Sequence, residues 1–347
     1  MNSTPVETAA DVQLMPIQFY QQELKKVLPE GIFKRTPSRL IYFISFMILN
    51  AALIWAVVYF NPAWYLKLAA AFVIGQLNAS LAFFAHESLH GSIVKSKMGQ
   101  DLIGFIGFLP YLVSPTYWRQ WHNTLHHGNT QLIYKDPDAF PTQMVYRRSK
   151  FMRVVFDLSP GSKHPLSYFY FFYWFTFQAA LNQFHMRFKN KMWQNLDHAQ
   201  VTREFGMMCI LVTGYVYWVG LDNLLWLIVI PFCVQNYVIM SYISTNHNIS
   251  PLTKVNDPLV NSLTVTTNSF WSFIHLNFGY HVEHHLFPRV SCSHAKIIHK
   301  HLVEMYPEKY QHMPKWTALK IIYRTPRIYK NATELIHPKT QMTYPTI

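Results

Sequence analysis

Three clusters of histidine are the residues in this sequence best suited to chemistry. They are His86 and His90, then His122, His126 and His127, and finally His281, His284 and His285. Residues three or four positions apart on a helix lie on one face, so imidazoles at these spacings can converge on a metal ion. Imidazole is a ligand for iron, copper, nickel and zinc. The clusters therefore predict metal chemistry without choosing the metal.

The first cluster, taken alone, also matches a protease motif. Residues 86–90 read HESLH, which is the HExxH pattern in which two histidines bind zinc and the glutamate acts as general base. Eight clustered histidines, however, exceed the four ligands that one zinc ion usually takes. Two metal ions explain the whole set more simply than one.

The composition indicates a membrane protein. Of the 347 residues, 50% are hydrophobic and only 14% are charged, against about 25% charged in a typical soluble protein. The three cysteines form no CxxC pair, which excludes a disulfide scaffold or a cysteine-type zinc site. The net charge of +13 favours anionic membrane lipid or an acidic protein partner, and we expect no nucleic acid to bind.

Long uncharged runs predict where the chain crosses the membrane. The run 40–60 has 21 residues, or about 30 Å of helix, which matches the hydrocarbon thickness of a bilayer. The runs 63–85, 205–221 and 224–243 are the other expected spans. The run 102–113 is too short to cross. The aromatic run 166–184 is expected to lie along the interface, because a crossing there would move the basic loop after it to the outer side.

These runs and the basic residues that flank them predict the fold class. We expect an all-α integral membrane protein with four transmembrane helices in two hairpins, interfacial helices, and a cytoplasmic cap that holds the histidines. The N-terminus, the three clusters and the C-terminus are then all cytoplasmic. Three segments follow: a polar N-terminal segment 1–37 without a cleavable signal peptide, a membrane domain 38–300, and a cytoplasmic tail 301–347.

The three clusters together resemble the boxes of the membrane fatty acid desaturase superfamily. They read HxxxH, HxxxHH and HxxHH, and residues 277–288, NFGYHVEHHLFP, are similar to that family's third box. The resemblance covers about residues 40–300 and implies two non-haem iron ions that use O2 to dehydrogenate a long acyl chain. It implies the eight box histidines as ligands. His247 matches an extra histidine that some members place between the last span and the third box.

Three further side chains are candidates for a supporting role. Asn277 is a candidate for a water-mediated contact with a metal, although a helix cap explains it nearly as well. Asp136 and Asp138 could accept the free N–H groups of ligand imidazoles, although an Asp-Pro turn would also account for them.

The resemblance also implies partners. The chain lacks the His-Pro-Gly-Gly signature of a fused haem module, so electrons would come from a separate donor, ferredoxin-like or cytochrome b5-like, steered by the basic charge. The substrate would be an acyl-lipid, an acyl-CoA or an acyl-carrier protein.

Several other functions remain open from the sequence. Within the same superfamily they are a fatty acyl hydroxylase or acetylenase and a carotenoid hydroxylase or ketolase. From different classes come an intramembrane zinc metalloprotease that uses the HExxH residues and a metal transporter or store. The protease would leave most histidines unexplained, and a transporter would place polar ligands inside the spans rather than at their ends.

Overall fold

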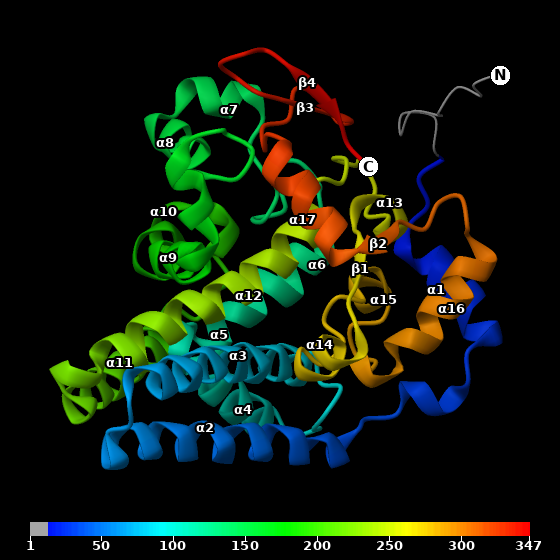
Figure 1. The fold of residues 1–347 in the computed structure, drawn as a ribbon. Coiled ribbons are helices and arrows are strands. Elements are labelled where there is room, and N and C mark those ends of the chain that lie inside the picture. Colours follow the sequence, from blue (N-terminus) through cyan, green and yellow to red (C-terminus); the bar gives the residue numbers. More distant parts are fainter. Residues whose placement is uncertain (1–12) are drawn as a thin grey trace.

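The computed structural model describes residues 13–347, most of them helical (Figure 1). Its helices in the first half are α1 (Ile17–Val27), α2 (Leu40–Phe60), α3 (Trp64–Leu89), α4 (Lys97–Phe108), α5 (Pro115–Trp118), α6 (His127–Asn129), α7 (Gln143–Arg148) and α8 (Lys150–Leu158). Those in the second half are α9 (Trp174–Leu181), α10 (Arg187–Lys189), α11 (His198–Val219), α12 (Ile230–His247), α13 (Pro258–Asn261), α14 (Ser269–Ile274), α15 (His281–Leu286), α16 (Ala295–Met305) and α17 (Lys315–Arg324).

Three helices within the described residues are long and apolar enough to cross a membrane. They span Pro37–Phe60, Trp64–Leu89 and Leu225–His247, so they correspond to three of the four expected spans. The fourth expected span, 205–221, falls within α11. That helix begins with a polar stretch up to Glu204 and ends at Val219, which leaves about 22 Å of uncharged helix. This length is shorter than the hydrocarbon layer of about 30 Å.

Two short turns lie together at the end of the bundle away from the histidines. Asn61 ends α2 in the left-handed conformation, with φ of 44°, which asparagine tolerates better than most residues. The Lys67 ammonium donates to the side chains of Asn61 at 2.5 Å and Asn223 at 3.5 Å. The turn between α2 and α3 therefore meets the turn after α11, as two hairpins side by side require.

The other end of the bundle is joined by a buried ion pair. Arg39, just before α2, pairs with Glu87 near the end of α3. The α4 helix packs on α3 at Gly107, where a Cβ atom would lie 2.5 Å from the Leu81 carbonyl oxygen. Only glycine permits this close approach of the two backbones. The α4 helix therefore packs directly against α3.

The aromatic run 166–184 forms no continuous helix. It begins as a 3-10 helix, Pro165–Phe172, breaks at Tyr173, and continues as α9 and a π-helical turn, Asn182–Met186. None of these pieces is long enough to cross a bilayer.

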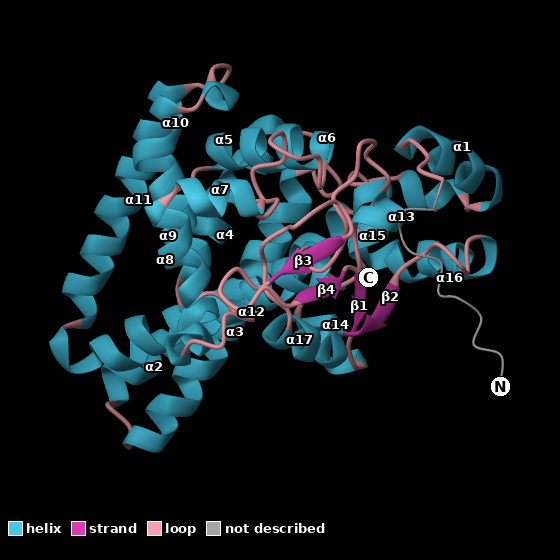
Figure 2. Cartoon of the chain, turned by 90° about the horizontal axis from the view of Figure 1, so that it is seen from above, coloured by secondary structure: helices cyan, strands magenta, loops and turns pink. Residues whose placement is uncertain are grey.

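The expectation of an all-α fold is wrong in one respect, because four short strands occur in the last quarter of the chain (Figure 2). They are β1 (Thr264–Thr266), β2 (His312–Pro314), β3 (Glu334–Ile336) and β4 (Thr343–Pro345). β1 pairs with β2 in parallel, and β3 pairs with β4 antiparallel. At three residues each, they are too short for an alternating pattern to distinguish them in the sequence.

Both terminal segments pack onto the body of the protein. In residues 301–347, α17 buries Ala318, Leu319 and Ile322 in the main hydrophobic core, and β2 joins this segment to β1. In the N-terminal segment, Tyr20 and Leu24 of α1 pack in a second core with residues of α15 and α16. Residues 1–12 of the segment 1–37 lie outside the described part of the chain.

Candidate metal centre

The nine candidate histidines come together at one end of the helix bundle. His86 lies in the last turn of α3, and His247 is the last residue of α12. The remaining seven come from the loop after α3, from the segment that leads into α6, and from α15. The C-terminal ends of α3 and α12 thus contribute ligands, and the short segments around α6 and α15, which lie near those ends, contribute others (Figure 1).

The nine imidazoles sort into two groups, each with its ligand nitrogens within 4.8 Å of one another. The five-histidine cluster contains His86, His90, His122, His127 and His284. The four-histidine cluster contains His126, His247, His281 and His285. The two clusters are adjacent, since the His127 and His285 rings stack with centroids 4.2 Å apart. This arrangement can hold two ions side by side.

A π-helical segment, Arg119–His126, explains how neighbouring histidines serve different clusters. The His127 amide donates to the carbonyl of His122, five residues back, so the turn holds one residue more than an α-helical turn. His122 and His127 therefore face one cluster, whereas His126 faces the other. The third box divides similarly, with His281 and His285 one α-helical turn apart in one cluster and His284 in the other. A shared helical face, expected for the first and third boxes, therefore holds for the first box but not for the third.

The spacing of the nitrogens fits a metal ion in each cluster. Neighbouring Nε2 atoms lie 2.7–3.2 Å apart, from His247–His281 at the short end to His126–His247 at the long end. An ion about 2.1 Å from each nitrogen would contact both members of such a pair. His90 Nε2 is buried without a hydrogen-bond partner among the described residues. A buried nitrogen without a partner lowers the stability of the fold unless a hydrogen-bond donor or a metal ion binds it.

The burial of the clusters favours neutral imidazoles, the form that binds metals. Burial, followed by the neighbouring histidines, lowers the pKa of His122, His127 and His285 well below the ordinary value. His126 differs: burial lowers its pKa, but the charges of Asp136 and Asp138 and the hydrogen bond to Asp136 outweigh this and raise it.

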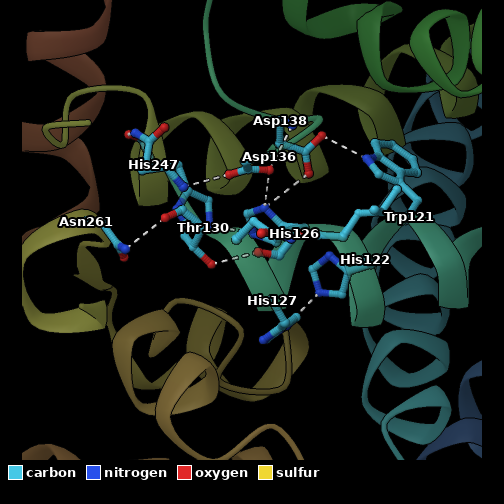
Figure 3. Close-up of polar contacts among 12 residues, drawn as sticks. Trp121, His122, His126, His127, Thr130, Asp136, Asp138, His247 and Asn261 are labelled. Atoms are coloured by element: carbon cyan, nitrogen blue, oxygen red, sulfur yellow. Dashed lines mark hydrogen bonds and ion pairs between the residues drawn. The ribbon is translucent and has the colours of Figure 1, made fainter. Parts of the chain in front are cut away.

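Hydrogen bonds behind the rings fix which nitrogen faces the centre (Figure 3). His126 Nδ1 donates to Asp136 at 2.9 Å, and His285 Nδ1 donates to the Thr130 hydroxyl at 3.2 Å. That hydroxyl in turn donates to the His126 carbonyl. In each ring the Nε2 lone pair is left free for a metal, which is how ligand histidines are usually oriented.

The two aspartates suggested by the sequence both lie beside the centre. Asp136 is buried, and it also accepts the amides of Gln131 and Asp138. Asp138 accepts from the Trp121 indole at 2.9 Å and lies 3.6 Å from His126 Nδ1. Burial raises the pKa of Asp138 to about 6. Asn277 is placed differently: its amide donates to the Cys292 carbonyl at 3.2 Å, and φ is 59°.

The two glutamates within the boxes have structural partners, which the sequence did not indicate. Glu87 pairs with Arg39 and accepts from the Ser291 hydroxyl at 2.7 Å. Glu283 accepts from Tyr310 at 2.5 Å and from Thr264 at 2.6 Å. Neither carboxylate belongs to a histidine cluster. Glu87 therefore ties α3 to other segments rather than acting as the general base of a protease.

The Glu87→Gln substitution is expected to lower the stability of the fold strongly but to lower iron binding only slightly. It leaves the Arg39 charge buried without its partner, a loss of about 3 kcal/mol or more. The measurements are the thermal melting temperature and the iron content of the purified protein. The double variant Arg39→Met/Glu87→Gln should recover much of the melting temperature, because no buried charge remains. A Gln variant with full stability but no activity would favour the protease mechanism instead.

An apolar cavity with a volume of about 60 Å³ ends at the histidines. Its walls come largely from aromatic and aliphatic side chains of α3, α12, α9 and the segment before α6, among them Ala82, Phe83, Trp118, Phe175 and Met240. His86, His122, His126, His247 and His281 lie at its polar end, so the cavity reaches both clusters. The lining is almost entirely apolar away from the histidines, and a slot of this composition suits a hydrocarbon chain.

Comparison with known proteins agrees with this geometry. The family model described as fatty acid desaturase matches residues 62–317, which include all nine histidines. The chain belongs to the fatty acid desaturase family. It is a membrane protein with buried histidine clusters of the kind this family uses to bind metal.

Relatives of this desaturase-family chain come from cyanobacteria and plants. It is 30% identical over 142 residues to an sn-1 acyl-lipid omega-3 desaturase (ferredoxin) from Nostoc sp., a match that covers 41% of this chain and 39% of the relative. It is 20% identical over 328 residues to the chloroplastic omega-6 fatty acid desaturase of Arabidopsis thaliana, which covers 91% and 70% of the two chains. The chain thus spans only about two fifths of the length of the Nostoc relative it matches.

Proposed function

We propose that this protein is a membrane-bound fatty acyl desaturase that introduces a C=C bond into a long acyl chain. The observation that carries the proposal is the pair of histidine clusters at the end of one apolar cavity. A hydrolase would need a polar path for water and a general base, and Glu87 is engaged by Arg39. Within the superfamily, hydroxylation and acetylenation differ from desaturation in outcome rather than in ligand set.

The nine histidines are proposed to hold two iron ions, one in each cluster. When bound, this pair supplies the O2-dependent removal of two hydrogen atoms from adjacent carbons, with two electrons from a donor. The chain's own part is to keep the imidazoles neutral, to orient their Nε2 atoms, and to exclude water. Burial favours the neutral form of rings such as His122, His127 and His285, and Asp136 and Thr130 contribute to the second by orienting His126 and His285. The apolar cavity wall accomplishes the third.

Positioning of the acyl chain is assigned to the cavity wall. Phe83, which stacks on Phe278 with centroids 4.1 Å apart, forms a rigid side of the slot. Ala82 and Met240 also line it, on α3 and α12. Because a chain held in a narrow slot has few conformations, its reacting carbons stay near the clusters. Asp138 lies at the same end of the cavity, close to His122 and His126.

The Asp136→Asn substitution is expected to reduce desaturation or iron affinity by about 10- to 100-fold. The amide can no longer accept from His126 with a full charge, so the ring loses the partner that fixes its orientation. Iron titration and turnover would be measured on the same preparation. Asp157→Asn is the matched control, since Asp157 pairs with Lys339 on the surface. Equal values for Asp136→Asn and the wild type would remove the orienting role.

The proposed topology is two hairpins with the centre on the cytoplasmic side. The turns at Asn61 and Asn223 meet at one end of the bundle, and the histidines lie at the other. Basic residues concentrate on the histidine side, which the positive-inside rule places in the cytoplasm. In this arrangement α11, although short, is the fourth span. The segment 38–300 is then the membrane domain, with both flanking segments packed on its cytoplasmic cap.

The proposed partners are an acyl-lipid substrate and a separate ferredoxin-type electron donor. Both agree with the name of the Nostoc relative, an acyl-lipid desaturase (ferredoxin). The net charge of +13 would steer an acidic donor to the protein.

The test is mass spectrometry of lipids from cells that express the protein. We expect lipids that have lost two hydrogen atoms, and we expect this product to vanish in a variant that lacks a cluster histidine. A gain of one oxygen atom in place of the loss would identify a hydroxylase. Unchanged lipids with an iron-loaded protein and an added donor would contradict the proposal.

A further inference from the structure

A second, larger cavity lies on the flank of the bundle. We call it the flank groove; its volume is about 760 Å³, and its walls come from α3, α12, α14, α17 and the segment 165–172. Most of the lining is apolar or aromatic, as with Phe72, Val234, Tyr237 and Leu319. Phe72 is exposed on the surface of a candidate span, so the groove is open where lipid would surround the bundle.

The flank groove is separate from the cavity that ends at the histidines. Along α12, Met240 and Ile243 line the histidine cavity, whereas Tyr237, Val238 and Ser241 line the flank groove. The wall between them includes the edge-to-face pair of Phe83 and Tyr242, with ring centroids 5.6 Å apart. The molecule that occupies the flank groove therefore need not be the acyl chain that reacts at the histidines.

One cation lies in the groove without an acidic partner. The Lys315 ammonium is 3.1 Å from the centroid of the Tyr242 ring, and among the described residues it forms no ion pair with a carboxylate. Burial lowers the pKa of Lys315 well below the ordinary value. A desolvated ammonium on one aromatic face is only partly compensated. An anion entering the groove would complete its environment.

The helix that carries Lys315 has the features of a helix at a membrane interface. The sequence of α17, KWTALKIIYR, contains three basic residues and no acidic one. One face is buried through Ala318 and Ile322, whereas Trp316 at the mouth of the groove is 66% exposed. Tryptophan is favoured at the level of lipid headgroups, and basic helices of this kind bind anionic lipid. No side chain caps the first turn of α17, so its amides also favour an anion there.

We propose that the flank groove binds one anionic phospholipid, with the phosphate at Lys315 and an acyl chain along α12. Between Val234 and Tyr242 the groove follows α12 for about 12 Å at 1.5 Å per residue, which accommodates a large part of an acyl chain. A bilayer phospholipid is the occupant because the groove opens on the apolar flank and its single unpaired charge is positive. The site does not depend on the proposed desaturase function, since it needs neither the metal nor the reacting cavity.

The test is native mass spectrometry of the purified full chain titrated with dioleoyl phosphatidylglycerol or with dioleoyl phosphatidylcholine. We expect one phosphatidylglycerol to be retained in preference to phosphatidylcholine. The Lys315→Met variant keeps the apolar stem and should weaken phosphatidylglycerol binding by about fivefold or more, since each lysine near a headgroup contributes about 1 kcal/mol. Lys315→Arg keeps the charge and should restore binding.

Lys320→Met is the matched control, because Lys320 is an exposed lysine of the same helix that does not line the groove. It should bind phosphatidylglycerol like the wild type. Equal affinity for the two lipids, or equal weakening by Lys315→Met and Lys320→Met, would overturn the site. Retention of oleate in place of phosphatidylglycerol would identify a fatty acid and also overturn it. A melting temperature measured for each variant separates loss of the site from loss of the fold.

Discussion

The His126→Ala/His127→Ala double variant is expected to lose both irons and all desaturase activity, although its two substitutions are adjacent in sequence. The reason is the π-helical turn, which directs His126 to the four-histidine cluster and His127 to the five-histidine cluster. By contrast, His122→Ala/His127→Ala removes two ligands from one cluster. It should therefore lose activity but keep one iron per chain. Single His126→Ala should likewise lose activity and one iron while the protein still inserts in the membrane, because His126 lies outside the spans.

The measurement is iron per chain by elemental analysis, with turnover on the same samples. His185→Ala is the control, since His185 is exposed and belongs to neither cluster; it should keep two irons and full turnover. If His122→Ala/His127→Ala lost both irons while folding normally, the division of the second box would be wrong. Full activity of His126→Ala would count against this histidine as a ligand.

The Ala82→Phe substitution is expected to abolish desaturation while both irons stay bound. Ala82 is buried in α3, about one turn before His86, and lines the cavity that ends at the clusters. A phenyl ring at this position fills the slot that the acyl chain would occupy. The ring can extend into the empty space of the cavity. The loss of folding stability from overpacking should therefore stay at about 1–3 kcal/mol. The histidines themselves are untouched.

Turnover and iron content, measured together, separate this blocked cavity from a damaged centre. Ala69→Phe is the control on the same helix, because Ala69 is exposed on the apolar surface. It should retain both activity and iron. Normal turnover of Ala82→Phe would show that the acyl chain takes another route. Loss of iron from Ala82→Phe would mean that the ring had displaced ligands instead.

The features that one short stretch of sequence determines could be predicted. The runs 40–60 and 63–85 form α2 and α3 within a few residues of the expected bounds, because an uncharged run of bilayer length has few other places to lie. The convergence of the three boxes was also predicted, because the expected arrangement of the spans brings all three to the same end of the bundle. The length of α11 was harder to judge, since the helix ends at Val219, two residues before the end of the expected span 205–221.

Features that depend on long-range contacts or on backbone irregularity could not be predicted. The π-helical turn at Arg119–His126 determines which histidines belong to the same cluster. No residue type in this segment indicates a π-helix in place of an α-helix. The Glu87 carboxylate appears catalytic in the HExxH pattern, but its partner Arg39 is 48 residues away. The short strands β1 and β2 pair across a similar distance. Tertiary packing decides each of these.

X-ray absorption at the iron edge, with elemental analysis of the purified, active protein, tests the central claim most directly. The account predicts two iron ions per chain, each surrounded mainly by histidine nitrogen, because the two clusters offer imidazole ligands alone. Active protein that contained zinc instead of iron, or a single iron bound by all the histidines, would contradict it.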